Sequence, residues 1–434
     1  MPTIAFATLG CRVNQYDTDS MRGLFLAAGF TEADFDGPAD VYVINTCSVT
    51  QVGEKKSRQL IRRTKKRNEA AKVIVTGCYA QLDPELLTSM PEVDAVVGTN
   101  ERKRIVSIVR ELLHDGEDEA ITAVHDVRRH DEFEEIPLYP SAVEHTRADL
   151  KIQEGCNNFC SYCIIPYTRG RLRSLPMEAA VAETKKLHDQ GFKEIVLTGI
   201  EVASYGLDLP GKPGLADVIC AVAEAAPGMR IRLGSLEPTV ITEDFCRRLA
   251  ETGRLCRHFH LSLQSGCDKT LKAMNRKYDT AGFYRAVELL RQYFPGCALT
   301  CDLITGFPGE TEEDQQQTLA FIRKCAFADM HIFPYSRRPG TPADAMPGQC
   351  ENAVKSRRAH EAQQVAEEMH QAFLEANLGQ TLPVLFETEA DGLWTGHSDS
   401  YVLVSAPGEN LRGSVRQVLI TERRGDQLFG HLAD

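Results

Sequence analysis

The sequence lacks the two features that mark exported and membrane proteins. No run approaches the roughly 18 uninterrupted apolar residues of a membrane-spanning helix. The opening residues, MPTIAFATLGCRVNQ, contain no basic segment ahead of an apolar one, so they do not resemble a secretion signal. We therefore expect a cytoplasmic protein with no membrane partner.

Cysteine is also scarce, and basic residues are outnumbered by acidic ones. The 14 cysteines among 434 residues amount to about 3%, far below the roughly 8 to 10% of secreted disulfide scaffolds. In a reducing compartment these thiols are expected to be free, catalytic or metal-bound. The 49 basic and 61 acidic residues give a net charge of −12, which would repel a polyanion if it were spread evenly. Any nucleic-acid site must therefore be a local patch.

The length predicts about three domains, because single cores seldom grow beyond roughly 250 to 300 residues. Residues 1–140 contain four apolar strands with helices between them, which indicates a parallel α/β domain. These strands are TIAFATLG, VYVINT, KVIVTG and DAVVGT. The end of this region, from His114 to Pro140, is acidic and aperiodic, as a linker or strap would be.

Residues 141–374 contain six apolar runs that alternate with helical stretches, which predicts a partial (βα)6 barrel of TIM-like type. The runs are DLKIQEG, EIVLTG, RIRLGS, HFHLSL, ALTCDLIT and DMHIFPYS. Sites in such folds lie at the carboxyl ends of the strands. After one more helix, residues 375–434 form five short strand patterns, so the overall class is α/β with a small OB-like β-barrel at the C-terminal end.

Three cysteines follow the first strand of the barrel closely. Cys156, Cys160 and Cys163 form a C-x3-C-x2-C motif on a single strand-end loop. Structural zinc requires four ligands, and no fourth Cys or His follows at short spacing, although a catalytic zinc with three thiolates is an alternative. A 4Fe-4S cluster held by three thiolates leaves one iron open to a substrate or cofactor. The spacing therefore favours the cluster.

This motif, with Tyr162 as the aromatic residue before the last cysteine, resembles that of the radical S-adenosylmethionine (SAM) superfamily. The resemblance implies that the open iron binds the amino and carboxylate groups of SAM, with Tyr162 beside the cofactor. Reductive cleavage of SAM then yields a 5′-deoxyadenosyl radical, and no acid–base catalyst is assigned.

Three other cysteines each follow a strand of the first domain. Cys11, Cys47 and Cys78 occur in TLGC, INTC and VTGC. Because the ends of parallel strands share one sheet edge, these residues could converge on a metal cluster. The alternative is three buried thiols that act as small hydrophobic side chains.

Scattered N-terminal cysteines, C-x3-C-x2-C and a C-terminal β-barrel together resemble the methylthiotransferases over nearly the whole chain. The resemblance implies a second 4Fe-4S cluster on Cys11, Cys47 and Cys78, and it identifies the small barrel as a TRAM domain. It also implies two molecules of SAM per reaction, one to methylate sulfur and one to activate a C–H bond. A reducing electron donor such as flavodoxin or ferredoxin is expected, and the sulfur donor is unknown.

Local sequence motifs resemble those of one branch of that family. The segments TLGCRVNQYDTD and GCNNFCSYCIIPYTRGRLRS are similar to the branch that converts N6-threonylcarbamoyladenosine at tRNA position 37 to its 2-methylthio form. Gly234 departs from this branch, which has serine there. Two enzyme alternatives are methylthiolation of isopentenyladenosine in tRNA and of a ribosomal protein. The non-enzyme alternative is a metal-dependent RNA-binding module.

Further candidates follow from position at strand ends. The resemblance places Gly199, Glu201, Gln264, Gly306 and Phe307 beside SAM. Glu201 could equally be a solvated carboxylate, and GFPGET alone reads as a turn.

Arginines near the barrel strand ends are candidates for binding the substrate, an anticodon stem-loop, because guanidinium groups suit phosphates and carboxylates. They are Arg169, Arg171, Arg173, Arg337 and Arg338. The basic stretch from Lys55 to Arg67 is either a solvated helix face or a phosphate-tracking surface. The acidic C-terminal barrel could bind RNA by stacking on Trp394 or Tyr401, unless these aromatics belong to its core.

Overall fold

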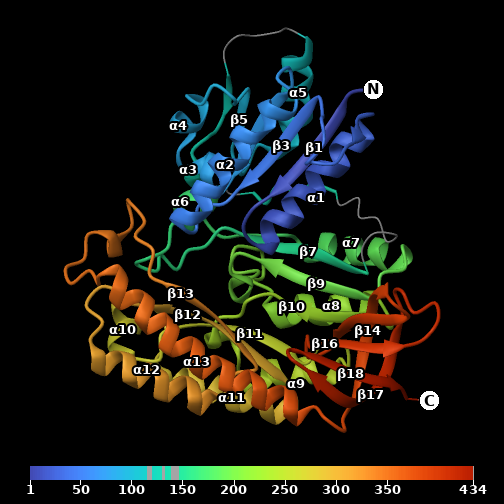
Figure 1. The fold of residues 1–434 in the computed structure, drawn as a ribbon, viewed down its shortest axis with the longest axis vertical. Helices are drawn as coiled ribbons and strands as arrows, with labels where there is room; N and C mark the ends of the chain where they lie inside the picture. The colour runs from blue at the N-terminus through green and yellow to red at the C-terminus, as the bar shows by residue number, and fades with distance from the viewer. Residues whose placement is uncertain (115–119, 130–131, 138–145, 434) are drawn as a thin grey trace. The chain divides into compact units, whose positions relative to one another are not determined.

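The computed structural model describes residues 1–114, 120–129, 132–137 and 146–433. The chain forms two compact units (Figure 1). The N-terminal unit comprises Met1–Pro140, Gln153–Leu175 and Ser336–Asp344, and the barrel unit comprises Ser141–Ile152, Pro176–Tyr335 and Ala345–Asp434. The domain boundaries expected from the sequence, at residues 140 and 374, stay a prediction.

A six-stranded parallel sheet forms the centre of the N-terminal unit, in the order β2-β1-β3-β4-β5-β6. The strands are β1 (Thr3–Thr8), β2 (Thr31–Glu32), β3 (Val41–Thr46), β4 (Lys72–Gly77), β5 (Ala95–Val97) and β6 (Ile121–Ala123). The four strands predicted from the sequence are confirmed. Strand β6 lies in the stretch expected to be a linker, parts of which (115–119, 130–131 and 138–140) lie outside the described residues.

Helices cover both faces of this sheet, because the strands bury side chains on both sides. Helices α1 (Arg12–Ala27) and α5 (Ile105–His114) share one core with Val43. Helices α2 (Gln51–Arg67), α3 (Cys78–Leu82) and α4 (Pro84–Thr88) share the other with Val75. The short elements η1 (Arg102–Arg104), η2 (Val127–Arg129), α6 (Ile165–Arg169), β8 (Arg173–Ser174) and η5 (Pro342–Asp344) complete the unit. The arrangement is the expected parallel α/β fold.

All six predicted strands of the half-barrel are present. They are β7 (Arg147–Glu154), β9 (Glu194–Gly199), β10 (Arg230–Leu233), β11 (His258–Gln264), β12 (Ala298–Thr305) and β13 (Asp329–Pro334). Strands β7, β9 and β10 form one sheet, and β11, β12 and β13 form another. A bridge between Leu236 and Leu261 connects the two sheets. Strand β7 passes into the N-terminal unit at Gln153, where its last two residues pair with β8.

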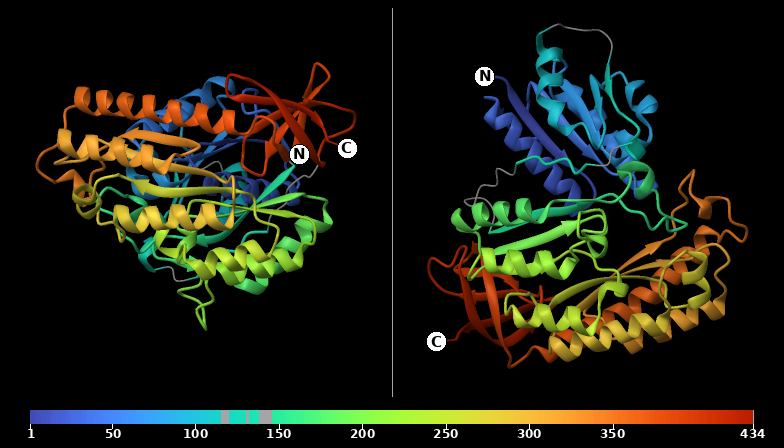
Figure 2. Two further views of the ribbon diagram at one scale, coloured as in Figure 1. Left: turned by 90° about the horizontal axis from the view of Figure 1, so that it is seen from below. Right: turned by 180° about the vertical axis from the view of Figure 1, so that it is seen from behind.

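Helices pack on the outer face of the half-barrel (Figure 2). Along β11 the buried residues Phe259, Leu261 and Leu263 alternate with more accessible ones. Phe259 packs on Phe294 at the end of α11, with ring centroids 4.9 Å apart. The helices and turns of this unit are α7 (Met177–Asp189), η3 (Val202–Ser204), α8 (Leu215–Ala225), η4 (Pro238–Val240), α9 (Glu243–Glu251), α10 (Asp268–Ala273), α11 (Thr280–Tyr293), α12 (Glu312–Cys325) and α13 (Asn352–Ala376).

The C-terminal segment forms a closed five-stranded barrel in the order β14-β15-β16-β18-β17, as predicted. Its strands are β14 (Thr381–Ala390), β15 (Leu393–Ser398), β16 (Leu403–Pro407), β17 (Val415–Arg424) and β18 (Gln427–Leu432). Trp394 is buried in its core with Phe386 and Val404, so this indole packs the interior and is not an exposed stacking platform.

Among the described residues, no helix is both long and apolar enough to span a bilayer.

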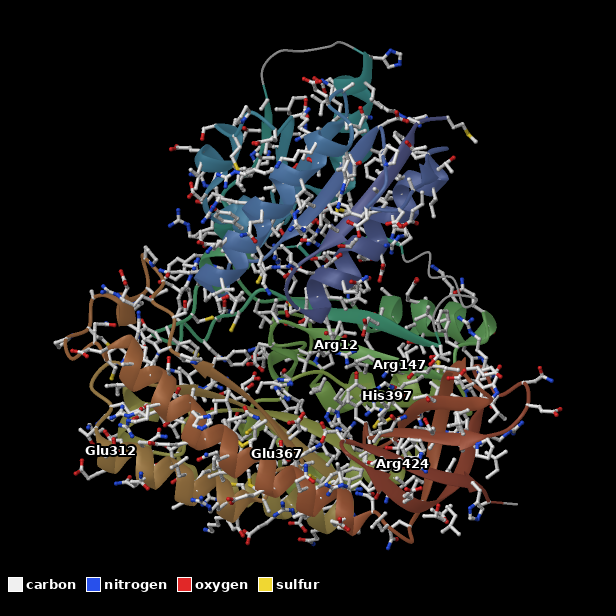
Figure 3. All side chains as sticks on the ribbon, in the orientation of Figure 1. Arg12, Arg147, Glu312, Glu367, His397 and Arg424 are labelled. Atoms are coloured by element: carbon white, nitrogen blue, oxygen red, sulfur yellow. The ribbon has the colours of Figure 1, made fainter. Side chains whose placement is uncertain are left out.

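Tyr401 anchors this small barrel to the half-barrel within the same unit. Its ring stacks on His258 and His397, with centroid separations of 5.1 and 4.7 Å. Arg232 lies over the same ring at 4.7 Å and donates to the carbonyl oxygens of Ser398 and Asp399. A second link joins Arg147 and His397, both labelled in Figure 3, through the carboxylate of Glu387. Tyr401 is half-buried, and its ring packs between the small barrel and the half-barrel.

Candidate metal centre and cofactor residues

The structure brings the three N-terminal cysteines together at one edge of the parallel sheet. Cys11 precedes α1, Cys47 directly follows β3, and Cys78 directly follows β4. Cys11 is exposed as a residue, but desolvation of its thiol raises its pKa, and burial raises the pKa of the half-buried Cys47 to about 11. The nearby Cys78 thiol raises both pKa values further, while Arg169 lowers them. The three sulfur atoms are thus close enough to interact electrostatically.

Gly10 allows this convergence. Its backbone has a φ of +110°, and a Cβ at this position would lie 3.0 Å from the Cβ of Cys47 and 3.2 Å from its Sγ. Any side chain would therefore displace the Cys47 thiol as well as strain the backbone. The glycine before Cys11 is part of the geometry of the site.

Hydrogen-bond donors point at these sulfur atoms. The backbone N–H of Val49 donates to Cys47 Sγ at 3.5 Å, and Arg169 Nε donates to Cys78 Sγ at 3.2 Å. Backbone N–H groups of Val13 and Asn14 lower the pKa of Cys11. Such donors stabilise thiolates, the form that binds metal. Three crowded thiols with donors aimed at them fit a metal cluster better than a packing role.

The second group of cysteines lies on the loop between β7 and α6. Cys160 is buried, and Cys156 and Cys163 are half-buried, as is Tyr162. The N–H of Asn158 donates to Cys156 Sγ at 3.4 Å. Three thiols on one short loop, with a donor on one sulfur, fit a cluster held by three thiolates.

Gly155 fixes the start of this loop. Its φ is +70°, and a Cβ there would lie only 1.9 Å from the carbonyl oxygen of Arg171. The next residue, Cys156, donates its backbone N–H to the carbonyl of Gly170 at 3.1 Å. The loop therefore closes on the segment after α6 through contacts that only glycine permits.

A buried ionic network joins the two groups of cysteines inside the N-terminal unit. Arg169 has no exposed surface, and its Nη1 lies 2.9 Å from Asp17 and 3.0 Å from Glu154. Its Nη2 donates to Asn14 Oδ1 at 2.5 Å. Arg102 pairs with the same two carboxylates and, at 3.0 Å, with Glu134 of the expected linker.

Sequence reasoning did not find Asp17 or Glu154. Their closeness in sequence to the cysteines could have indicated them, because Asp17 follows Cys11 by six residues on α1 and Glu154 precedes Cys156 by two. Arg169 was expected to contact substrate, and the structure gives its side chain the partners of this network.

The other candidate arginines divide into buried and exposed residues. Arg173 is buried and donates to Asn100 Oδ1 at 3.0 Å, and Arg338 is buried in an ion pair with Glu54. Arg337 is exposed and pairs with Asp344 at 2.9 Å. Arg171 is exposed, and its side chain forms no hydrogen bond or ion pair with the part of the chain that the structure describes. Their contact with substrate stays a prediction.

The barrel unit places two carboxylates together just after the ends of β9 and β10. Glu201, two residues after Gly199 at the end of β9, accepts a hydrogen bond from the N–H of Ala203 at 3.3 Å. Burial raises the pKa of Glu201, and the adjacent Glu237 raises it further. Arg276 lies 3.6 Å from Glu237 and partly offsets this effect. A pair of buried carboxyl groups favours a shared proton or a bound cation such as an ammonium group. Arg276 was not found from the sequence.

The remaining candidates lie at the ends of β11 and β12. Gln264 has a φ of +65°, and Gly306 has a φ of +70° with its N–H donated to Glu310 at 3.0 Å. A Cβ on Gly306 would meet the Lys355 side chain at 2.5 Å. Phe307 is fully buried against Tyr335, with ring centroids 5.5 Å apart. The ring of Phe307 is therefore not exposed to a cofactor pocket, and its contact with SAM stays a prediction.

The basic stretch from Lys55 to Arg67 lies on α2 and leaves a cationic face. Three of its eight basic residues contact other elements: Arg58 donates to Tyr79, Lys65 pairs with Asp94, and Arg67 pairs with Asp36. The exposed ones are Lys55, Lys56, Arg62, Arg63 and Lys66. A cleft of about 580 Å³ beside α2 is lined by the basic residues Lys55, Arg58 and Arg338 and by the acidic residues Glu54 and Asp83, among others.

Comparison with known proteins agrees with the site. The family model of the radical SAM superfamily matches residues 150–322, and that of the uncharacterized protein family UPF0004 matches residues 3–98. A solved structure of the radical SAM methyltransferase TsrM from Kitasatospora setae, with cobalamin and a [4Fe-4S] cluster bound, has a TM-score of 0.57 and 17% identity. The structural match covers 91% of this chain and 80% of the TsrM chain. The fold is that of a radical SAM enzyme, whose cofactors are SAM and 4Fe-4S clusters.

Two sequence relatives specify the family. The threonylcarbamoyladenosine tRNA methylthiotransferase MtaB of Bacillus subtilis is 40% identical, over 97% of this chain and 94% of its own. The protein of the same name from Aquifex aeolicus is 37% identical, over 96% of this chain and 100% of its own. The chain therefore belongs to the MtaB-like radical SAM methylthiotransferases.

Proposed function

We propose that this protein transfers a methylthio group to the adenine C2 of N6-threonylcarbamoyladenosine at position 37 of tRNA. The observation that carries the proposal is the pairing of two cysteine triads in one unit, joined through Arg169. Relatives named for this activity at 37 to 40% identity over nearly the full chain support it.

The two triads hold different clusters in this proposal. Cys156, Cys160 and Cys163 would hold the cluster that, when bound, supplies the electron for reductive cleavage of SAM. The second triad, formed by Cys11, Cys47 and Cys78, would hold the auxiliary cluster. The chain's own contribution is to orient these thiols through N–H donors and to hold the sheet edge rigid through the buried ions of Asp17, Glu154 and Arg169.

The carboxylate pair is assigned to the ammonium group of SAM. Glu201 and Glu237 are both buried, and Glu237 raises the pKa of Glu201. A bound ammonium would offset this effect, so cofactor binding and ionisation of Glu201 would favour each other. Gly199 and Gly306 leave room for close approach of the cofactor at neighbouring strand ends.

The RNA contacts are assigned to the N-terminal unit and to two exposed arginines. The cationic face of α2 suits the phosphate backbone, which positions RNA without reading its sequence. The threonylcarbamoyl group carries a carboxylate, which Arg171 or Arg337 can pair with as a planar fork. The electron donor is proposed to be a flavodoxin or ferredoxin, and the location is proposed to be cytoplasmic.

The test supplies anaerobically reconstituted protein with anticodon stem-loops that carry adenosine, isopentenyladenosine or threonylcarbamoyladenosine. Mass spectrometry of the nucleosides should show methylthio product with threonylcarbamoyladenosine alone. Equal product from isopentenyladenosine, or product on a ribosomal protein and on no RNA, would reject the proposed substrate while keeping the chemistry. RNA binding without any product or SAM cleavage would identify a binding module instead.

A further inference from the structure

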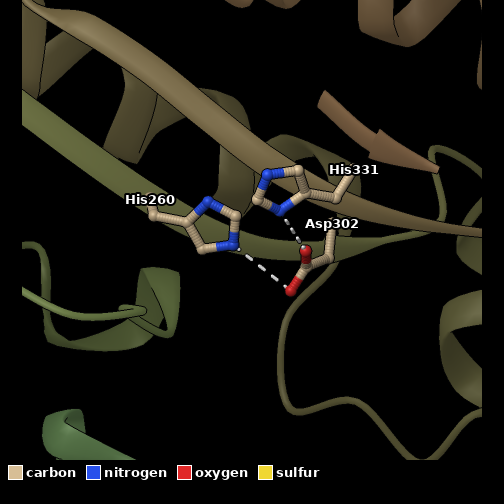
Figure 4. Close-up of side chains that lie close together, drawn as sticks. All are labelled: His260, Asp302 and His331. Carbon is tan, nitrogen blue, oxygen red and sulfur yellow. Dashed lines mark hydrogen bonds and ion pairs between the residues drawn. The ribbon is translucent and has the colours of Figure 1, made fainter. Parts of the chain in front are cut away.

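Two histidines and an aspartate converge on the inner face of the half-barrel. His260, Asp302 and His331 lie on the neighbouring strands β11, β12 and β13, and their side chains point toward one another (Figure 4). His260 Nε2 is 3.2 Å from one carboxylate oxygen of Asp302, and His331 Nδ1 is 3.3 Å from the other. One ligand atom from each of the three residues lies within 4.8 Å of the others.

We propose that this group binds one divalent transition-metal ion of the zinc type. Imidazole nitrogen and carboxylate oxygen are the ligands that such ions take outside thiolate sites, and two histidines with one carboxylate form a recurrent three-ligand set. Bonds of about 2.0 to 2.1 Å in a tetrahedral site separate neighbouring ligand atoms by about 3.3 Å. The two measured separations, which end on different oxygens of Asp302, are close to that value, so a rotation of the carboxylate could bring one oxygen and both nitrogens around an ion.

A hydrogen bond behind the site orients one of its ligands. His260 Nδ1 is 2.9 Å from the Thr300 hydroxyl on β12, which turns Nε2 toward Asp302. Metal-binding histidines usually have such a partner on the second nitrogen, because it fixes the tautomer and the ring plane. Thr300 is in turn 3.2 Å from His258 Nε2, so the orienting hydroxyl is itself held.

The exposure of the three side chains suits ion entry and a water ligand. The exposed fraction rises from 13% for His260 through 28% for Asp302 to 59% for His331. The inner ligand is therefore fixed and the outer one is accessible. Three protein ligands leave a fourth tetrahedral position, which water can fill from the side of His331. A bound ion would also cross-link three adjacent strands of the half-barrel.

The experiment uses the full chain with both iron–sulfur clusters filled, so that the cysteines assigned to them are occupied. The protein is equilibrated anaerobically with Zn²⁺ against a competing chelator, and zinc and iron are counted in the same sample. We expect one zinc per chain in addition to the cluster iron. Asp302→Asn and His331→Gln should weaken zinc binding at least tenfold, whereas His360→Gln, an exposed histidine of α13, should leave it unchanged.

X-ray absorption at the zinc edge provides the second readout, because nitrogen and oxygen ligands are distinguishable from sulfur. Ligation by nitrogen and oxygen alone in the wild type supports the site. Sulfur ligation, no retained zinc, or equal zinc in the Asp302→Asn and wild-type proteins would overturn it, and the three residues would then be a hydrogen-bonded His–Asp–His group. Circular dichroism and cluster absorbance verify that each variant is folded, and His331→Gln, at the most exposed ligand, is the variant least expected to disturb packing.

Discussion

Arg169 Nε donates a hydrogen bond to Cys78 Sγ at 3.2 Å, although the two residues are 91 positions apart. Arg169 follows Cys163 by six residues, so the segment that carries the second cysteine triad reaches directly to a thiol of the first. The same guanidinium forms ion pairs with Asp17 and Glu154. A change at Arg169 should therefore affect both triads at once.

Metal content gives the first prediction. Anaerobically reconstituted protein should hold about eight irons per chain, because each triad is assigned one four-iron cluster. Replacing Cys11, Cys47 and Cys78 together with Ala should remove about half of this iron, and so should replacing Cys156, Cys160 and Cys163. Iron and zinc counts by mass spectrometry provide the measurement. Zinc in place of iron, or unchanged iron in the N-terminal triple variant, contradicts the two-cluster assignment.

The second prediction separates the roles of the triads. Only the loop triad has the spacing that leaves an iron open to SAM, so the N-terminal triple variant should still form 5′-deoxyadenosine from SAM and attach no methylthio group to RNA. The loop triple variant should do neither. Chromatography of the SAM products under reducing conditions measures both. SAM cleavage that survives the loss of Cys156, Cys160 and Cys163 would refute the assignment.

The third prediction concerns stability. Arg169→Met would leave two buried carboxylates, Asp17 and Glu154, with less compensating charge, and breaking a buried pair costs about 3 to 5 kcal/mol. The denaturation midpoint in urea, followed by circular dichroism, should fall accordingly. Arg171→Met is the matched control, because that arginine is exposed on the same segment and should change stability little. Equal midpoints for the two variants would show that Arg102 alone neutralises the carboxylates.

Acid stability provides the fourth prediction. Burial alone would raise the pKa of Glu194, but Arg232 and Arg230 lower it to about 2, against an ordinary value of 4.5. The ionised carboxylate therefore stabilises the fold above pH 4.5, and this contribution is lost as the pH falls from 4.5 toward 2. A shift of this size corresponds to about 3 kcal/mol.

The measurement is urea unfolding at several pH values. Glu194→Gln should be less stable than the wild type at pH 7, and the difference should shrink toward pH 2. Glu224→Gln, at an exposed glutamate of α8, should follow the wild-type curve. A difference that is constant with pH would mean that the lost hydrogen bonds, and not the charge, account for the effect.

Secondary structure and the convergence of cysteines could be predicted because both follow from short-range patterns. Apolar runs located the long strands, and the rule that parallel strands end at one edge brought Cys11, Cys47 and Cys78 together. Strand β6 was missed because three residues in an acidic stretch carry no periodicity, and pairing with β5 supplies the backbone hydrogen bonds that make it a strand.

The partners of charged side chains could not be predicted in the same way. Arg169, Arg173 and Arg338 were all expected to be available to substrate, yet each is buried. Pairing depends on residues that are distant in sequence, such as Asp17 for Arg169 at a separation of 152, and no local pattern records it. The same limit applies to His260, Asp302 and His331, which are ordinary strand residues until the register of β11, β12 and β13 places them side by side.

The packing of Tyr401 against Arg232 and His258 has a practical consequence for any truncation of the chain. Deleting the C-terminal barrel would remove the ring beneath Arg232 and the carbonyl groups of Ser398 and Asp399 that accept from it. The guanidinium and Glu194 would then face solvent at the base of the half-barrel. A truncated protein that loses activity would consequently report a damaged scaffold as much as a lost RNA-binding module, so point substitutions on the outer surface of the barrel are the cleaner probe of tRNA binding.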